Sequence, residues 1–219
     1  YRPARLGRVL AVGALLWALP FAALLFSQGW SATLTQMAWF FSKAALVTFG
    51  GAYAVLPYVN QAAVEHYQWL TAAQMMDGLA LGETTPGPLI MIVAFVGYLG
   101  GAQTSTALAV AGAVVATWFT FLPSFIFILA GGPWVETTRG NLKLTAPLAA
   151  ISAAVVGVMF TLAIDFIAAY AVNTAAIGQF DYKAMLLMLA AGLALWRFKL
   201  GVISLIALCA LAGFAVKMA

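Results

Sequence analysis

Long apolar segments with almost no charged residues fill most of this sequence. Two examples are LAVGALLWALPFAALLFS (10–27) and ISLIALCALAGFAV (203–216). A helix of about 20 apolar residues crosses the hydrocarbon core of a bilayer, which is about 30 Å thick. Only 7% of the residues are charged and the mean hydropathy is +1.03, whereas a soluble domain carries about 25% charged residues. The sequence therefore predicts an all-α integral membrane protein that has the lipid bilayer as a partner.

Cysteine and histidine are too scarce for most metal and cofactor sites. Cys209 and His66 are the single residues of their kinds. A disulfide framework, a thiolate zinc site, an iron–sulfur cluster, a bis-histidine haem or a zinc triad therefore cannot come from this chain alone. Because no nucleophile–base pair or cofactor motif is present either, we predict neither an enzyme nor a cofactor. We attribute the net charge of +4 to positive residues in the loops on one side of the membrane, and we do not take it as a sign of nucleic-acid binding.

The apolar segments define candidate membrane spans. We expect them at roughly 9–28, 33–59, 88–101, 103–130, 146–172, 183–198 and 200–217. The first span follows Arg2, Arg5 and Arg8, and it is longer than the apolar region of a secretory signal. We therefore divide the chain into a basic tail with a linker transmembrane helix (1–31) and a larger multi-span unit (32–219).

The positive residues favour about seven crossings. If 60–101 contains one net crossing, seven Lys and Arg residues lie on the side of the N-terminus and two on the other side. If that segment only dips into the membrane and returns, the division becomes five to four. Because positive residues concentrate in cytoplasmic loops, the first arrangement is favoured, with the N-terminus inside and the C-terminus outside.

The segment 60–87 is more polar than its surroundings. Thr71 and Gln74 have the spacing of a capping box, and Leu70 and Met75 have that of a hydrophobic staple. We expect a short helix from about 72 to 81 that ends at Gly82 in a left-handed cap.

Two spans are interrupted by helix-breaking residues. Gly50 and Gly51, and then Pro57, interrupt 33–59, and Thr84-Thr85-Pro86-Gly87-Pro88 precedes the short span 88–101. Open backbone at membrane depth must be buried in protein or line a watery cavity, and broken helices are the best sequence indicator of a transporter's binding site. The free N–H groups of each new half-helix suit an anion. The alternative is a helix-packing site or a simple kink.

Lys43 lies about ten residues into its span. A lysine at mid-depth costs roughly 2.5–3.5 kcal/mol, so we expect a partner or a cavity beside it. It is either the counter-charge of an anionic ligand or a lysine that snorkels to an interface. Glu83 is expected to pair with Lys43, to carry a proton or to lie in a wet vestibule, and Asp165 lies within its span or near its end. His66 is interpreted as an interfacial residue.

The two interrupted segments together resemble the chromate ion transporter (CHR) family, specifically the second of its two homologous halves. The resemblance covers about 60 residues, TFGGAYAVLPYV (48–59) and GLALGETTPGPLIMIVAFVGY (78–98), with the polar helix between them. The matching residues are Phe49, Gly50, Gly51, Tyr53, Ala54, Pro57, Trp69, Leu70, Gly78, Thr85, Pro86, Gly87, Pro88, Gly97 and Tyr98.

This resemblance implies a multi-pass secondary transporter, such as an antiporter, that exports chromate across the bacterial inner membrane. The family's members consist of two halves of opposite orientation, an inverted repeat, in one chain or in paired short chains. The linker span would then precede a six-span repeat (32–219). Because the motifs occur only once here, we expect a C-terminal half that needs its N-terminal homologous half, in the same chain or in a partner protomer, with a homodimer as a further possibility.

The resemblance and the residues together give a candidate oxyanion site. It combines the backbone of the helix breaks, threonine hydroxyls and one cation, in the set Lys43, Thr48, Gly50, Gly51, Tyr53, Thr84, Thr85, Pro86, Gly87 and Pro88. Glu83 is the first candidate for proton coupling and Asp165 the second. Sulfate has the shape and charge of chromate, so both oxyanions stay open, as do a channel subunit and a structural membrane subunit.

Overall fold

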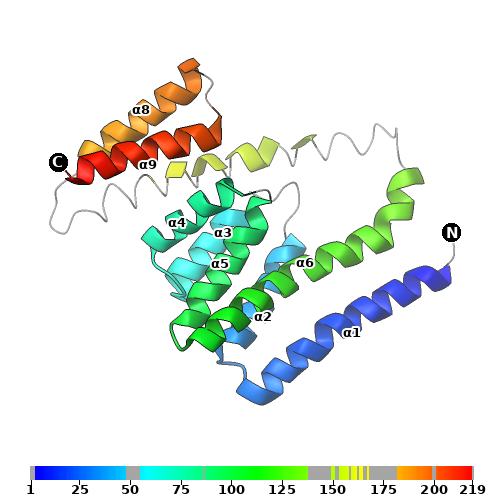
Figure 1. Cartoon of the computed structure of the whole chain (residues 1–219). Coiled ribbons are helices and arrows are strands. Elements are labelled where there is room, and N and C mark those ends of the chain that lie inside the picture. The colour runs from blue at the N-terminus through cyan, green and yellow to red at the C-terminus, as the bar shows by residue number, and fades with distance from the viewer. Residues whose placement is uncertain are drawn as a thin grey trace.

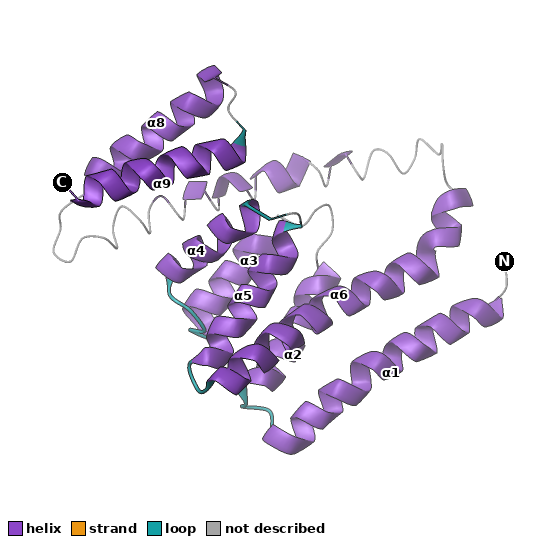
Figure 2. Cartoon of the chain, in the orientation of Figure 1, coloured by secondary structure: helices purple, strands orange, loops and turns teal. Residues whose placement is uncertain are grey.

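The computed structural model describes most of the chain as helix. The described residues are 3–47, 55–85, 87–137, 182–198 and 201–218, together with short helical pieces between 149 and 167. The helices are α1 (Pro3–Gln28), α2 (Thr33–Val47), α3 (Leu56–Asn60), the π-helix η2 (Gln61–His66), α4 (Ala72–Glu83), α5 (Pro88–Ala102), α6 (Thr106–Thr137), α8 (Tyr182–Phe198) and α9 (Val202–Met218). Since the described residues contain no strand (Figure 2), the predicted all-α class is confirmed for them.

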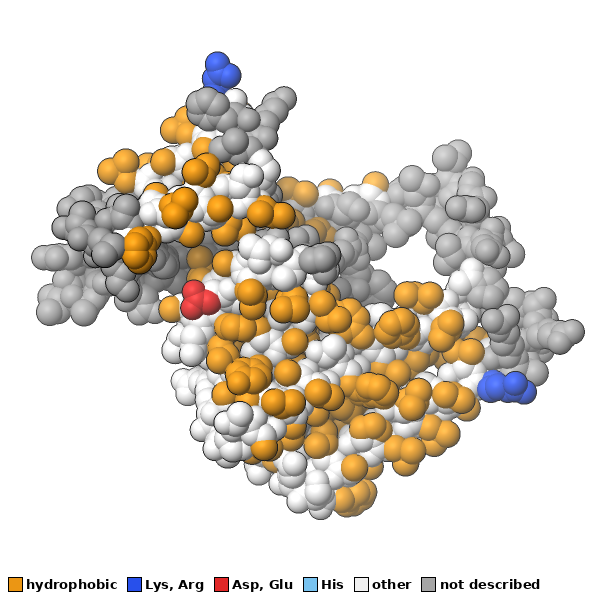
Figure 3. All heavy atoms as spheres, viewed as in Figure 1, with side chains coloured by type: hydrophobic (Ala, Val, Ile, Leu, Met, Phe, Trp, Pro, Cys, Tyr) orange, Lys and Arg blue, Asp and Glu red, His pale blue; other side chains and the backbone are white. Residues whose placement is uncertain are grey.

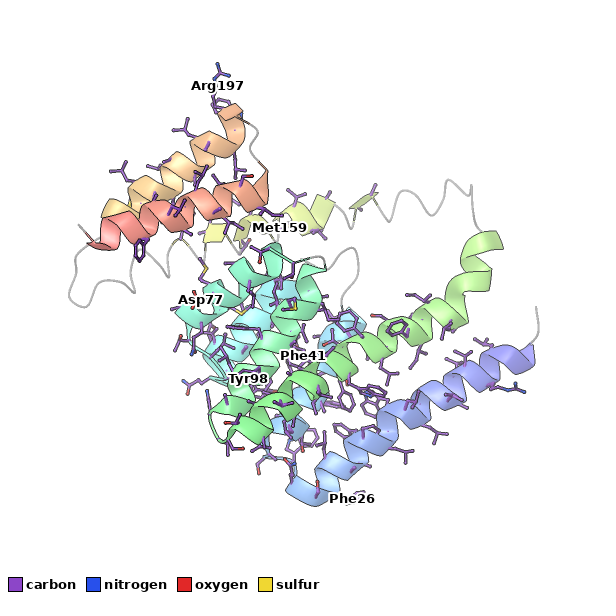
Figure 4. The ribbon with its side chains drawn as sticks, in the orientation of Figure 1. Phe26, Phe41, Asp77, Tyr98, Met159 and Arg197 are labelled. Carbon is purple, nitrogen blue, oxygen red and sulfur yellow. The ribbon has the colours of Figure 1, made fainter. Side chains whose placement is uncertain are left out.

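Helices α2, α5 and α6 form the centre of the molecule (Figure 1). α5 and α6 form a hairpin, α2 packs against α6, and α1 runs beside α6. Phe41, Ile92 and Phe119, one from each central helix, are fully buried, and Phe41 lies inside the bundle in Figure 4. The α8–α9 hairpin lies apart from this centre and contacts α4 through α9.

Glycine allows α5 and α6 to approach closely. Gly97 and Gly101 on α5 face the backbone of α6, where Gly112 faces Gly97 in return. A Cβ added at Gly97 would meet the Gly112 carbonyl oxygen and would lie 2.7 Å from the Ala116 Cβ. Small residues at four-residue spacing permit this approach between apolar helices, where hydrophobic burial contributes little.

Tryptophan hydrogen bonds attach α1 to the central helices. The Trp17 indole N–H donates to the Ser42 hydroxyl of α2 at 2.7 Å, and the Trp118 indole N–H donates from α6 to the Leu16 carbonyl at 3.2 Å. The Trp17 ring also stacks on Phe21, with 4.9 Å between ring centroids. These contacts fix α1 along α6 although its outer face is apolar and exposed.

Two described helices are long and apolar enough to cross a membrane. They are Leu6–Gln28 within α1, with mean hydropathy 2.4, and Thr106–Gly132 within α6, with mean hydropathy 2.0. The apolar parts of α5, α8 and α9 are shorter than a full span. The expected seven crossings are therefore not confirmed. Hydrophobic side chains cover much of the face in Figure 3, and Phe26 on α1 is 87% exposed, as expected of a surface that meets an apolar environment.

The capping box before α4 is confirmed, but the predicted end of that helix is wrong. The Gln74 N–H donates to the Thr71 hydroxyl oxygen at 3.2 Å, and the Gln74 side-chain oxygen accepts from the Thr71 N–H at 2.9 Å. α4 does not end at Gly82 but continues to Glu83. The glycine with a left-handed backbone at this junction is Gly87, with φ +87°. Threonine hydroxyls satisfy the last carbonyls of α4, so no glycine cap is required there.

The expected boundaries of the neighbouring spans also differ from the structure. Helix continues past 59, because α3 leads directly into η2 and ends at His66. α6 continues beyond 130 to Thr137. Most of the expected span 146–172, and residues 48–54 with the Gly50–Gly51 break, lie outside the described residues.

The turn between α5 and α6 holds the segment that follows η2. The Gln103 side-chain amide donates to the Gln68 and Trp69 carbonyls at 2.7 and 2.8 Å. Gln68 has φ +54°, a left-handed conformation that costs energy for a residue with a side chain. Gln103 therefore stabilises a strained turn between η2 and α4.

Replacing Gly97 with alanine is expected to destabilise the protein, because the added methyl group meets the α6 backbone. Overpacking of this kind costs about 1–3 kcal/mol. Thermal unfolding of the purified protein in detergent should show a midpoint lowered by several degrees. Gly131→Ala on α6 is the matched control, since an added Cβ there contacts nothing within 4 Å. An equal midpoint for the two variants would contradict the close-packing interpretation.

Candidate functional site

The helix break predicted at Thr84–Pro88 is present between α4 and α5. α4 ends at Glu83, and α5 begins at Pro88, whose missing N–H leaves no donor unsatisfied at the first helical position. Gly87 precedes it with φ +87° and ψ +63°, a left-handed conformation for which glycine is favoured. The chain thus stops one helix and starts the next within a few residues.

Both threonine hydroxyls at the break act as caps of α4. The Thr84 hydroxyl donates to the Leu81 carbonyl at 2.8 Å, and the Thr85 hydroxyl donates to the Gly82 carbonyl at 2.9 Å. Their protons are therefore directed to α4 in this conformation. Pro88 has no N–H, and the Ile90 N–H donates to the Gly87 carbonyl at 3.2 Å. The break therefore offers an anion the Leu89 N–H and the positive end of the α5 helix dipole.

Lys43 lies on α2, half-buried, at the edge of a pocket. Its Nζ is 5.7 Å from the ring centroid of Trp39, one turn earlier on the same helix. Among the residues that the structure describes, Lys43 makes no ion pair. Lys43 is also one of the residues that line the pocket.

The pocket beside Lys43 has a volume of about 500 Å³. It is lined by Phe40, Lys43, Tyr58, Gln61, Ala62, Glu65, His66 and Tyr67. α2 supplies one wall, and α3 and η2 supply the other. We define this set as the Lys43 pocket.

Aromatic rings form the inner wall of the Lys43 pocket. Phe40 stacks on Tyr58 at 5.1 Å between centroids, and its centroid is 5.8 Å from that of Tyr67. Tyr67 stacks in turn on the buried Trp69 at 4.5 Å. Burial raises the pKa of Tyr67, and Tyr58 raises it further. The Tyr67 phenol therefore stays neutral at physiological pH and keeps its hydrogen-bond donor.

The described part of the candidate site divides between two places. Thr84, Thr85 and Gly87 lie at the break, and none of them lines the Lys43 pocket. The predicted residues Thr48, Gly50, Gly51, Tyr53, Pro86 and Asp165, and the side chains of Glu83 and Pro88, lie outside the described residues.

Sequence reasoning did not identify four lining residues of the Lys43 pocket, and it gave His66 only an interfacial role. The four are Tyr58, Gln61, Glu65 and Tyr67. The available signal was the polar spacing in QAAVEH (61–66). Gln61 and Glu65 share a face of any α-helix, whereas His66 joins Gln61 on one side only when the segment is a π-helix.

Known proteins resemble the chain over most of its length. A model of the family described as chromate transporter matches residues 35–214. A chromate transport protein of Pseudomonas aeruginosa is 37% identical over 211 residues, which are 94% of this chain and 48% of that protein. A chromate transport protein of Cupriavidus metallidurans is 32% identical over 124 residues, 57% of this chain and 29% of that protein. No solved structure matches.

The chain spans about half the length of the Pseudomonas relative, and less of the Cupriavidus protein. The match nevertheless includes both the Lys43 pocket and the break between α4 and α5. Its apolar helices agree with a membrane protein. The chain therefore belongs to the chromate transporter family.

Proposed function

We propose that this chain is the C-terminal half of a secondary transporter that exports chromate across the bacterial inner membrane. The names of the Pseudomonas and Cupriavidus relatives support chromate as the substrate. A half is proposed because the 211 matched residues amount to 48% of the Pseudomonas protein. The missing partner would be the N-terminal homologous half, in the same polypeptide or in a second protomer.

The break between α4 and α5 is the observation that carries this proposal. A left-handed Gly87 and Pro88 open the N-terminus of α5, an apolar helix that is shorter than a full membrane span. Such a terminus presents N–H groups and a partial positive charge of about +0.5, which suit a tetrahedral dianion. Lys43 would add a full positive charge, and residues 48–51 would supply the second break.

The short helices fit a broken-span architecture. α5 has 15 residues, or about 22 Å at 1.5 Å per residue, and is too short to cross the hydrocarbon core alone. α8 and α9 have 17 residues each. We infer a linker span followed by a six-span repeat, in which half-helices meet at the substrate site, as in transporters with inverted repeats. Glu83 and Asp165 remain the proposed proton carriers.

Lys43→Met is expected to abolish chromate export, because it removes the cation from the site. Cells that express the complete natural protein should accumulate less chromate than cells without it, and the Lys43→Met variant should lose this protection. Lys43→Arg keeps the charge and should retain part of the activity, with equal membrane levels verified for all variants. Full export by Lys43→Met would refute the site. If the unaltered protein leaves chromate uptake unchanged, sulfate is the oxyanion to test next.

Gly87→Ala is expected to reduce export more than Gly29→Ala does. Both glycines have positive φ, +87° and +82°, so alanine costs about 1–2 kcal/mol of backbone strain at either position. Only Gly87 lies at the break. Chromate accumulation should therefore rise for Gly87→Ala and stay at the unaltered level for Gly29→Ala. Equal accumulation in the two variants would make the break a packing feature of a structural or channel subunit.

A further inference from the structure

The segment Gln61–His66 is a π-helix, a conformation that is rare and often found at functional sites. Its widened turn is seen in the bond from the Tyr67 N–H to the Ala62 carbonyl, five residues earlier, at 2.8 Å. The Trp69 N–H reaches back six residues to the Ala63 carbonyl, also at 2.8 Å. The extra residue in the turn rotates the end of the helix relative to an α-helix.

This rotation determines which side chains face Lys43. In an α-helix, residues five apart lie on different sides. In the π-helix they lie one turn apart, so Gln61 and His66 both line the Lys43 pocket, together with Glu65. The π-helix thus places an amide and an imidazole in the pocket that Lys43 of α2 also lines.

The Lys43 pocket is rich in hydrogen-bond donors. It holds the Lys43 ammonium, the Gln61 amide, an N–H of His66, and the hydroxyls of Tyr58 and Tyr67. Phe40 contacts the rings of both tyrosines, with 5.1 Å to the Tyr58 centroid and 5.8 Å to the Tyr67 centroid, and so gives the pocket an aromatic side. Glu65 is the single carboxylate among the lining residues, and its side chain is exposed, as are those of Gln61 and His66.

We propose that the Lys43 pocket binds a tetrahedral dianion of the chromate and sulfate class, held between Lys43 and the π-helix donors Gln61 and His66. The inference rests on the proposed function and extends it, because it adds a binding surface from η2 that the helix breaks do not include. Lys43 supplies the positive charge, and the N–H groups of Gln61 and His66 donate directional hydrogen bonds to the anion. Glu65 opposes the anion and weakens its binding.

The direct test is equilibrium binding of radiolabelled chromate and sulfate to the purified complete protein in detergent. Lys43→Met, Gln61→Leu and His66→Phe should each weaken binding about tenfold or more, because each removes a hydrogen bond to a charged ligand. Lys43→Arg should restore most of the affinity. Gln28→Leu is the matched control, since Gln28 lies at the end of α1, outside the Lys43 pocket, and it should bind like the unaltered protein.

Glu65→Gln is expected to change the affinity for the oxyanion in the opposite direction from the Lys43, Gln61 and His66 variants. Removing the carboxylate from the Lys43 pocket should strengthen oxyanion binding severalfold, because repulsion of the dianion is lost. A misfolded protein does not bind more tightly, so this gain separates a site residue from a structural one. Unchanged or weaker binding by Glu65→Gln would overturn the proposal, as would unaltered affinity in Lys43→Met and His66→Phe.

Measuring both binding and transport distinguishes a failure of this inference from a failure of the proposed function. If the unaltered protein lowers cellular chromate while the π-helix variants bind and export normally, the pocket proposal fails and the transport function stands. If sulfate alone binds with the predicted variant pattern and chromate accumulation is unchanged by the protein, the pocket proposal holds and the chromate assignment fails.

Discussion

The close approach of α5 to α6 is the contact on which the rest of the structure depends. Gly97 and Gly112 face each other across this contact, and no side chain separates the two backbones. α2 and α1 then pack on α6, so the position of Lys43 follows from where α6 lies. The same hairpin fixes the start of α5 and therefore the location of Gly87. The α5–α6 contact therefore positions both proposed parts of the oxyanion site, the Lys43 pocket and the break at Gly87, although neither part belongs to that contact.

The η2 segment depends on the same hairpin through a polar contact. Gln103 follows α5 and holds the Gln68 and Trp69 carbonyls at the turn after the π-helix. Trp69 is buried beneath Tyr67 and packs against Phe41 of α2. The unusual backbone of η2 is therefore held between the core and the α5–α6 turn. These contacts also position the η2 residues that line the Lys43 pocket.

Local signals with a short range were predictable from the sequence, and features set by distant contacts were not. The Thr71–Gln74 capping box and the helix start at Pro88 depend on neighbouring residues, and both are present. The predicted cap at Gly82 failed because the hydroxyls of Thr84 and Thr85 satisfy the α4 carbonyls. The widened turn of the π-helix leaves no signal in so short a segment, so the common side of Gln61 and His66 could not be predicted. Lys43 was found because a lysine in an apolar helix is costly wherever it lies.

The junction between α4 and α5 also has a polarity of its own. The carbonyl end of α4 and the amide end of α5 face the same few residues, so the electrostatic potential changes sign across the gap. The Thr84 and Thr85 hydroxyls reduce the negative end by donating to it. An anion would therefore find one attractive side and one weakly repulsive side, and it would be held asymmetrically.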